Sequence, residues 1–240
     1  MGAPAPAALA KAYYKDAVND TAIRLATDPG GLYVPPASGP FSMSAWTWDR
    51  QGATRYPWNY ENASTAVQFG VTHAGRYVQL HIRDGASLKV NTAVDFGVTR
   101  VGEWVKWLAV RDAADLWKVY ARALGDVAWV SSTDGGDTYT GMSAGIDRLS
   151  VGVGSNWNGS NGAMVAVERD LWASGEEAAW FTDPQAVPVL GADDGIRYLC
   201  ESGYPQLLDD GPNANHMTLA GATEETAFYA GYPPTDAGGP

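Results

Sequence analysis

Apolar and polar side chains alternate along much of the segment between residues 31 and 170. A period of two puts successive side chains on opposite faces of an extended strand, whereas an amphipathic helix needs apolar positions three and four residues apart. Turn residues, mostly Gly and Asp, separate the alternating runs at roughly 8–12 residues, as in sandwiches and jelly rolls. The pattern predicts an all-β jelly-roll β-sandwich with strands at 41–48, 77–82, 88–90, 104–110, 117–121, 127–130, 149–153 and 163–167.

The alternation also predicts how two of these regions are arranged. Segment 41–48 alternates apolar and small polar residues, which is typical of a strand buried on one face only. Segments 77–82 and 88–90 flank Asp84-Gly85, a dipeptide that favours a hairpin turn. The middle of the chain is therefore predicted to form two stacked antiparallel sheets.

A short helix is predicted near the N-terminus, over residues 9–18. Leu9, Tyr13 and Ala17 recur there at four-residue spacing, which would place all three on one stripe of a helix.

A second short helix is predicted over residues 176–181. Ser174 stands three residues before Glu177, the spacing of a capping box in which the serine hydroxyl accepts a hydrogen bond from the backbone N–H of the glutamate. Trp180 and Phe181 would then anchor the helix to the sandwich.

Composition and charge exclude several classes of protein. The 240 residues carry 16 basic and 27 acidic side chains, and the net charge of −11 opposes binding to nucleic acid. Hydrophobic residues make up 45% of the chain and charged residues 18%, so a disordered chain is excluded. The many Gly, Pro and aromatic residues suit an all-β protein with short strands.

The sequence contains few signals for disulfide formation, membrane insertion or secretion. Cys200 is the only cysteine, so the chain has no internal disulfide and no zinc site built from cysteines. The sequence contains no run of about 18 apolar residues, so it predicts no membrane-spanning segment. The first residues lack the basic start and apolar run of a signal peptide, so we expect synthesis in a host cytoplasm.

Six short segments in the middle of the chain share their order with a known family. They are 31–35, 39–46, 107–110, 119–120, 149–152 and 161–165, and the Ser-x-x-Glu helix follows them. In this order they resemble laminin-G-like, concanavalin-A-like jelly-roll domains. The resemblance covers residues 13–220, which leaves an N-terminal arm over 1–12 and a C-terminal tail over 221–240.

Two flanking segments, 14–18 and 209–219, resemble pieces of bacterial and phage members of this family. In those members the strand like 209–219 usually opens the domain, whereas here it closes the chain, a permutation that neighbouring termini tolerate. The resemblance implies a bacteriophage minor tail protein located in the virion and released by lysis.

Aromatic residues outside the clearest strands are the best binding signal. Tyr56, Trp58 and Tyr60 stand beside Pro and Asn, and Trp157 with Asn158 lies in a polar, turn-forming segment. A sugar ring can stack its apolar face on such rings while asparagine side chains bond its hydroxyl groups. These five residues are therefore the candidate glycan-binding residues; alternatively, the rings cap the sandwich or contact a neighbouring subunit.

Asp134 and Asp137 belong to the segment Ser132–Tyr139, which matches the pattern Ser-x-Asp-x-Gly-x-Thr-aromatic. This pattern favours a hairpin turn whose aspartate bonds backbone amides. The same two carboxylates could instead hold Ca²⁺ together with loop carbonyls. They are the only metal-site candidates, and no other cofactor is expected.

Glu168 and Asp170 begin the carboxylate pattern of jelly-roll glycoside hydrolases, but the second glutamate of that pattern is missing. We therefore assign no catalytic residue and interpret both carboxylates as the solvent-facing end of a strand. His73, His81 and His216 have no metal-ligand spacing, and His81 is expected on the solvent face of its strand.

Together these observations predict a non-enzymatic structural or adhesion protein of a bacteriophage virion. Its expected partners are other virion proteins, further copies of itself in a homo-oligomer, and host-surface glycan bound through loop aromatics. Two alternatives remain open: a capsid decoration protein without glycan binding, and a glycoside hydrolase of the jelly-roll type.

Overall fold

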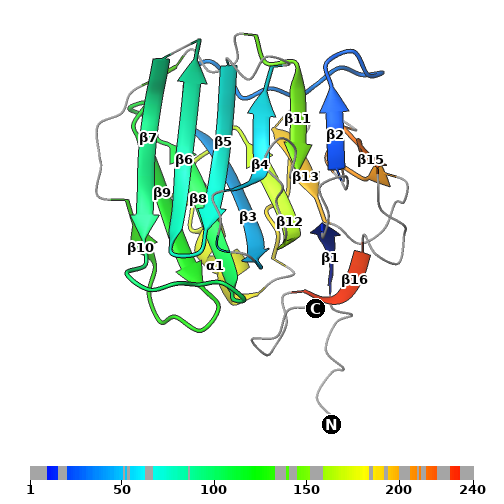
Figure 1. Ribbon diagram of the computed structural model, residues 1–240. Helices are drawn as coiled ribbons and strands as arrows, with labels where there is room; N and C mark the ends of the chain where they lie inside the picture. Colours follow the sequence, from blue (N-terminus) through cyan, green and yellow to red (C-terminus); the bar gives the residue numbers. More distant parts are fainter. Residues whose placement is uncertain are drawn as a thin grey trace.

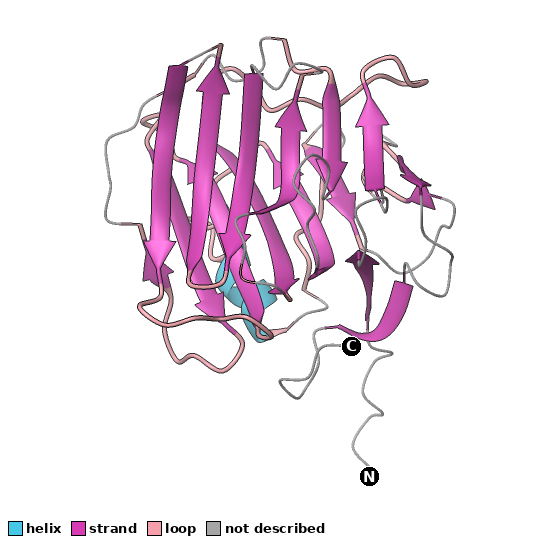
Figure 2. Ribbon diagram, viewed as in Figure 1, coloured by secondary structure: helices cyan, strands magenta, loops and turns pink. Residues whose placement is uncertain are grey.

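A computed structural model describes residues 10–15, 21–50, 52, 55–62, 67–85, 87–132, 139–140, 145–151, 159–183, 186–191, 194–199, 206–209, 211, 215–220 and 228–232. Within these residues the strands form two stacked antiparallel sheets (Figures 1 and 2). The one helix of this part of the chain is α1 (Glu176–Thr182). The predicted all-β jelly-roll β-sandwich is confirmed.

The two sheets, A and B, each contain strands from distant parts of the chain. Sheet A has the order β10 (Val130–Ser131), β9 (Trp117–Ala123), β8 (Trp104–Arg111), β3 (Phe41–Asp49), β12 (Gly159–Val167), β1 (Ala10–Lys15) and β16 (Phe228–Tyr232), and β13 (Gly195–Tyr198) also pairs with β12. Sheet B has the order β14 (Gln206–Leu207), β15 (Met217–Ala220), β2 (Thr21–Leu25), β11 (Arg148–Val151), β4 (Arg55–Glu61), β5 (Val67–Ala74), β6 (Tyr77–Asp84) and β7 (Ser87–Asp95).

The main hydrophobic core lies between the two sheets. Alternate residues of the central strands point into it, and aromatic rings pack across the gap: the rings of Phe69 in β5 and Trp117 in β9 are 5.5 Å apart. Phe41 of β3 packs edge-on against Phe69 at 5.9 Å. Strand alternation thus supplies one apolar face from each sheet, as expected for a sandwich.

A second apolar cluster covers the opposite face of sheet A, beneath α1, which Figure 2 shows behind the strands. Trp46 of β3, Trp104 of β8 and Trp180 of α1 are each at most 1% exposed in this cluster. Strand β3 is therefore buried along its whole length. The prediction that 41–48 is half-buried is wrong, because α1 seals the face that the small polar residues were expected to leave open.

A buried ion pair joins α1 to sheet A. Lys106 of β8 and Glu177 of α1 are both fully buried, and Lys106 Nζ lies 3.0 Å from Glu177 Oε1. Lys106 also donates a hydrogen bond to Ser44 Oγ and lies 3.0 Å from the centre of the Trp180 ring. Burial lowers the pKa of Lys106 to about 7, although Glu177 opposes that shift.

Replacing Glu177 by Ala should destabilise the fold by about 3–5 kcal/mol, because the buried amino group of Lys106 would lose both its counter-charge and a hydrogen-bond acceptor. Urea unfolding at pH 7 measures this loss. The matched control is Glu176→Ala in the same helix, where a partly exposed pair with Arg169 should contribute about 1 kcal/mol or less. Equal losses in the two variants would contradict the assignment.

A polar pair bridges the two sheets at one end of the core. His73 of β5 and Thr47 of β3 are both buried, and Thr47 Oγ1 lies 3.1 Å from His73 Nδ1. Burial lowers the pKa of His73 to about 4, and the nearby carboxylate of Asp49 only partly opposes this. His73 is therefore neutral in the folded protein down to acidic pH.

This histidine makes stability depend on pH with a definite sign. Its pKa is lower in the folded than in the unfolded chain, so between pH 6.5 and 4 the unfolded state binds more protons and stability falls as pH falls. The loss should reach up to about 3 kcal/mol. His73→Asn should flatten this part of the curve in urea unfolding at several pH values, and curves of identical shape for both proteins would contradict the prediction.

Both ends of the chain depart from expectation. The helix predicted over 9–18 is wrong, since Ala10–Lys15 is β1 and pairs with β12 on one side and β16 on the other. These partners satisfy the backbone of a tyrosine-containing segment that suits a strand. Phe228–Tyr232 forms β16 inside the expected C-terminal tail. The expected arm boundary between residues 12 and 13 therefore falls within β1, and the expected tail contains β16 of sheet A.

The predicted helix over 176–181 is confirmed as α1, but its capping box does not form. Gly175 is the N-cap in a left-handed conformation, with no side-chain capping bond. Ser174 Oγ instead donates to Glu176 Oε2 over 2.8 Å. The carboxylate of Glu177 is directed to Lys106 beneath the helix, so it cannot reach back to the N-terminus.

Candidate functional site

The outward face of sheet B carries rows of hydrogen-bonding side chains. Cross-strand pairing aligns Asn59 of β4 with Gly70 of β5, Gly70 with His81 of β6, and His81 with Asn91 of β7. The inward neighbours on the same strands belong to the hydrophobic core, so strand alternation sends these residues outward. We call this surface the polar face.

A neighbouring row extends the polar face across the same strands. It aligns Arg148 of β11, Glu61 of β4, Gln68 of β5 and Arg83 of β6. Amide, carboxylate and guanidinium groups thus lie side by side on a rigid sheet.

An irregularity in β4 brings an aromatic ring to the polar face. Between Arg55 and Trp58 the register with β5 shifts by one residue, and Pro57 lies within this shift. Proline lacks the N–H that a regular ladder needs, so bulges accommodate it. Tyr56 consequently lies over the outward side of β5, with its ring 6.1 Å from the ring of His81.

Gly70 provides the space for this ring. A Cβ at position 70 would lie 2.7 Å from Tyr56 Cδ1 and nearer still to Asn59 Oδ1, closer than real contacts allow. The glycine is therefore required by two side chains of the polar face and not by its own backbone conformation.

The centre of the polar face is closely packed. Asn59 is 1% exposed and donates through Nδ2 to Glu61 Oε2 over 2.8 Å. Burial raises the pKa of Glu61, while Arg148 and the Asn59 hydrogen bond oppose the rise. These groups are held in place beside Tyr56 by packing and hydrogen bonds, so they cannot rearrange freely to contact a ligand.

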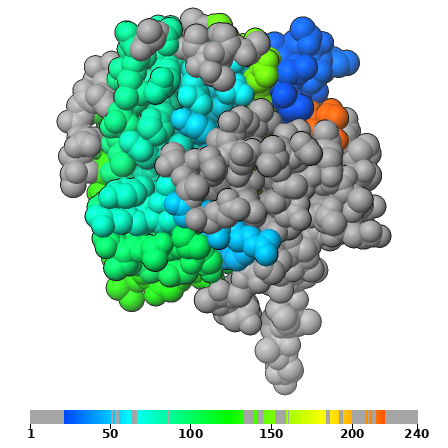
Figure 3. All heavy atoms as spheres, in the orientation of Figure 1, coloured from blue at the N-terminus to red at the C-terminus, as the bar shows by residue number. Residues whose placement is uncertain are grey.

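The half of the polar face over β6 and β7 is open to solvent, in the teal and green part of Figure 3. Gln79 and His81 are half-buried, whereas Arg83 and Asn91 are exposed. Gln79 Nε2 donates to Asn91 Oδ1 over 2.5 Å. Burial, with a contribution from Arg83, lowers the pKa of His81, so its imidazole is neutral near pH 7 and can both donate and accept hydrogen bonds.

The structure separates the three candidate aromatics of segment 55–60. Tyr56 lies on the polar face, but Trp58 and Tyr60 are fully buried in the core between the sheets. Their assignment as glycan-binding residues is wrong, because 55–61 is a strand and its alternation points both rings inward. The alternative that rings pack into the sandwich holds for these two.

The remaining candidate residues fall outside the described residues. Trp157 and Asn158, proposed for glycan binding, and Asp134 and Asp137, proposed for Ca²⁺, therefore stay predictions. Among the residues that the structure describes, no group of three or more His, Cys, Asp or Glu could hold a metal ion. In the same residues no helix has the length and hydrophobicity to cross a membrane.

The two carboxylates considered for glycoside hydrolysis accept hydrogen bonds from other groups of the fold. Glu168 Oε1 accepts a hydrogen bond from the Tyr33 hydroxyl over 3.3 Å. Asp170 Oδ1 accepts the backbone N–H groups of Trp172 and Ala173, each over 2.9 Å, and so holds the turn after β12.

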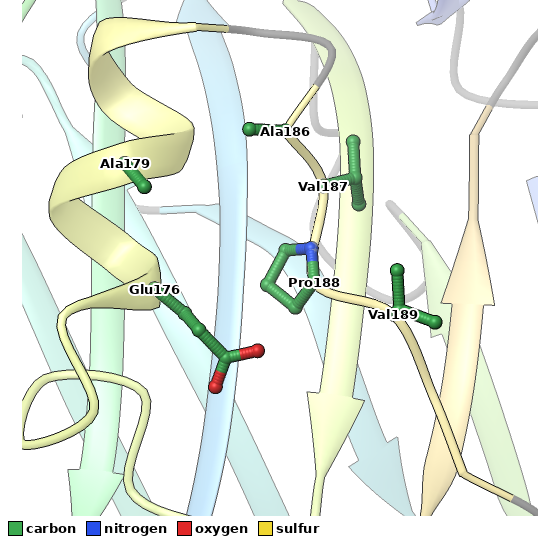
Figure 4. A pocket seen from close by; sticks show the side chains of 6 residues that line it. All are labelled: Glu176, Ala179, Ala186, Val187, Pro188 and Val189. Atoms are coloured by element: carbon green, nitrogen blue, oxygen red, sulfur yellow. The ribbon is translucent and has the colours of Figure 1, made fainter.

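A shallow groove of about 330 Å³ lies between α1 and the segment 186–189 (Figure 4). The carboxylate of Glu176 at its edge is held by Arg169 through two hydrogen bonds, so the groove itself presents alkyl groups. Its lining residues are Glu176, Ala179, Ala186, Val187, Pro188 and Val189.

Sequence reasoning missed most of the polar face. Asn59, Gln68, Gln79 and Asn91 were not singled out, although each alternates with core residues in its strand. Period-two alternation was the available signal, and it placed His81 correctly on the outward face. The register that brings these residues into rows was not readable from one sequence.

Comparisons with known proteins find similarity among solved structures. No family model and no curated protein matches the chain. Among solved structures, it is similar to domains LG4-5 of the mouse laminin alpha1 chain, with 10% identity and a TM-score of 0.44, covering 67% of this chain and 41% of that one. It is also similar to the LG1-3 region of the laminin alpha2 chain, with 8% identity and a TM-score of 0.45, covering 67% and 31%.

A third similar structure is the CBM40 domain of the Ruminococcus gnavus IT-sialidase, bound to alpha2,6 sialyllactose. Identity is 13% and the TM-score 0.45, with 64% of this chain and 89% of that one covered. The chain spans less than half of either laminin structure. At these identities the similarity concerns the sandwich architecture, which the strand pairing of this chain establishes independently.

Gly70→Ala should displace Tyr56 and destabilise the protein by about 1–3 kcal/mol, because the new methyl group overlaps Tyr56 and Asn59. The matched control is Gly125→Ala, where a Cβ would meet no atom within 4 Å. Urea unfolding gives the stability, and the ring signals of Tyr56 in NMR spectra report its position. Unchanged Tyr56 signals in Gly70→Ala would refute the proposed packing.

Proposed function

We propose that this domain binds glycan without transforming it, and that the open half of the polar face is the binding surface. The observation that carries the proposal is the placement of Tyr56 beside a row of outward polar side chains on rigid strands. A sugar ring offers one apolar face for stacking and a rim of hydroxyl groups for hydrogen bonds. Tyr56 matches the first requirement, and His81 and Asn91 match the second.

The rigidity of this surface supports binding of a flat, hydroxyl-rich ligand. The groups sit on strands whose opposite side chains are locked in the core, so little conformational freedom is lost when a ligand binds. Arg83 adds a cation at the open rim, which favours glycans that carry a carboxylate or sulfate group.

We place this activity on a bacteriophage virion, as that of a minor tail protein that contacts other virion proteins and copies of itself. The support is the likeness of segments 14–18 and 209–219 to phage members of the resembled family. Many copies on one particle would convert weak sugar contacts into strong adhesion to a host surface. The role is adhesive, and the hydrogen bonds already made by Glu168 and Asp170 support it over catalysis at those two carboxylates.

The proposal predicts that Tyr56→Ala weakens glycan binding at least tenfold, a loss of about 1.4 kcal/mol, because the stacking ring is removed. Tyr56→Phe should stay within about threefold, since it keeps the ring. The ligand is first identified on an array of neutral and acidic glycans, and affinities are then measured by titration calorimetry. Asn91→Ala tests the hydrogen-bonding row.

The control is Val98→Ala, at an exposed site outside the polar face. Equal affinity of a glycan for the wild type and for Tyr56→Ala would refute the assignment of the polar face as the binding surface. Release of reducing sugar from the bound glycan would instead favour a hydrolase.

A further inference from the structure

Four aromatic side chains gather on the outward side of sheet A, on the opposite side of the sandwich from the polar face. They come from separate elements: Tyr120 from β9, Trp129 from the segment before β10, Trp172 from the turn after β12, and Phe181 from α1. Alternation in β9 places Tyr120 outward, because Val119 and Ala121 on either side are core residues. We call this group the aromatic platform.

The rings of the aromatic platform are closely ordered. Trp172 stacks on Tyr120 with ring centres 3.9 Å apart and planes 10° from parallel. Trp129 meets Trp172 edge-to-face at 5.7 Å and Phe181 at 5.4 Å. Stacking on Tyr120 holds the Trp172 ring in one plane. The second face of the Trp172 ring is directed away from Tyr120.

Contacts beneath the platform hold this arrangement in place. Asp170 Oδ1 accepts the backbone N–H of Trp172 and so fixes the turn that carries it. Phe181 stacks on Trp46 at 5.2 Å, and the guanidinium carbon of Arg122 lies 3.9 Å from the centre of the Phe181 ring. The platform is therefore ordered before any ligand arrives, which reduces the entropy lost on binding.

Trp172 is exposed, whereas most other tryptophans that the structure describes are enclosed. It is 37% exposed, whereas Trp46 and Trp180 are fully buried. An exposed indole held flat by specific contacts is typical of a recognition surface. A stable protein–protein interface needs about 800 Å² from each partner, far more than one partly exposed indole offers, so a small flat occupant fits better.

The charges at the rim restrict the kind of occupant. Burial raises the pKa of Tyr120, and the carboxylates of Asp170 and Asp112 raise it further, so both lie close enough to act on its hydroxyl group. Lys118 and Arg122, the two outward cations of β9, balance these carboxylates, so the rim carries no net charge. Carboxylates accept hydrogen bonds from sugar hydroxyl groups and cations donate them, and a rim without net charge does not favour an acidic sugar over a neutral one.

We propose that the aromatic platform is a second binding site, which stacks the apolar face of a neutral pyranose on Trp172, with the rim carboxylates and the Tyr120 hydroxyl bonding its hydroxyl groups. This site is separate from the polar face, where Arg83 favours acidic glycans. One domain would then hold two glycans of different charge on opposite sides and could link two chains.

The test uses the full chain and two neutral probes, chitotetraose and cellotetraose, with a tetramer of galacturonic acid as the acidic probe. Saturation-transfer NMR and calorimetry should show that the wild type binds at least one neutral probe. Trp172→Ala should weaken that binding at least about tenfold. Trp172→Phe should retain part of it, and Tyr56→Ala on the polar face should leave it unchanged.

Three results would overturn the proposal: no binding of either neutral probe, equal binding by wild type and Trp172→Ala, or loss of neutral-probe binding in Tyr56→Ala alone. Sedimentation would also reject it if the wild type formed a dimer that Trp172→Ala dissolved, since the platform would then be a contact between copies. If Trp172→Ala fails to fold, the indole N–H signal of Trp172 in the wild type must shift on titration with the neutral probe.

Discussion

The buried pair of Lys106 and Glu177 determines how the outer side of sheet A is closed. Two charges removed from water are tolerated here because they meet at 3.0 Å and because Ser44 and the face of Trp180 complete the surroundings of the ammonium group. With α1 held in place, the second apolar cluster is sealed from solvent. The same helix also supplies Phe181 to the aromatic platform.

This closure gives the two sheets different roles. In sheet A the central strands β3 and β8 are covered on both faces and are buried along their whole length. Sheet B is apolar on one face only, and its other face is free to carry amides, imidazole and guanidinium groups. A sandwich with one doubly covered sheet can thus keep a broad, rigid and polar surface without exposing core residues.

Both candidate surfaces depend on local departures from regular strand geometry. On the polar face, the register shift at Pro57 redirects Tyr56, and Gly70 leaves room for its ring. On the opposite side, Asp170 fixes the turn that lays Trp172 over Tyr120. In each case ordered backbone positions the ring in advance, so aromatic exposure is a property of the fold and not of a loose loop.

Period-two alternation in the sequence was enough to determine the sandwich and the outward position of His81, because each strand must bury one side of its own residues, and the turn dipeptide Asp84-Gly85 located the hairpin. Alternation could not reveal that a helix covers 41–48, that 10–15 pairs within a sheet, or that a one-residue shift separates Tyr56 from Trp58. Those outcomes depend on register and on partners distant in the chain. Only the tertiary structure decides them. Which strands pair, and which face of a sheet a helix covers, depends on contacts between distant segments and not on the residues of one segment.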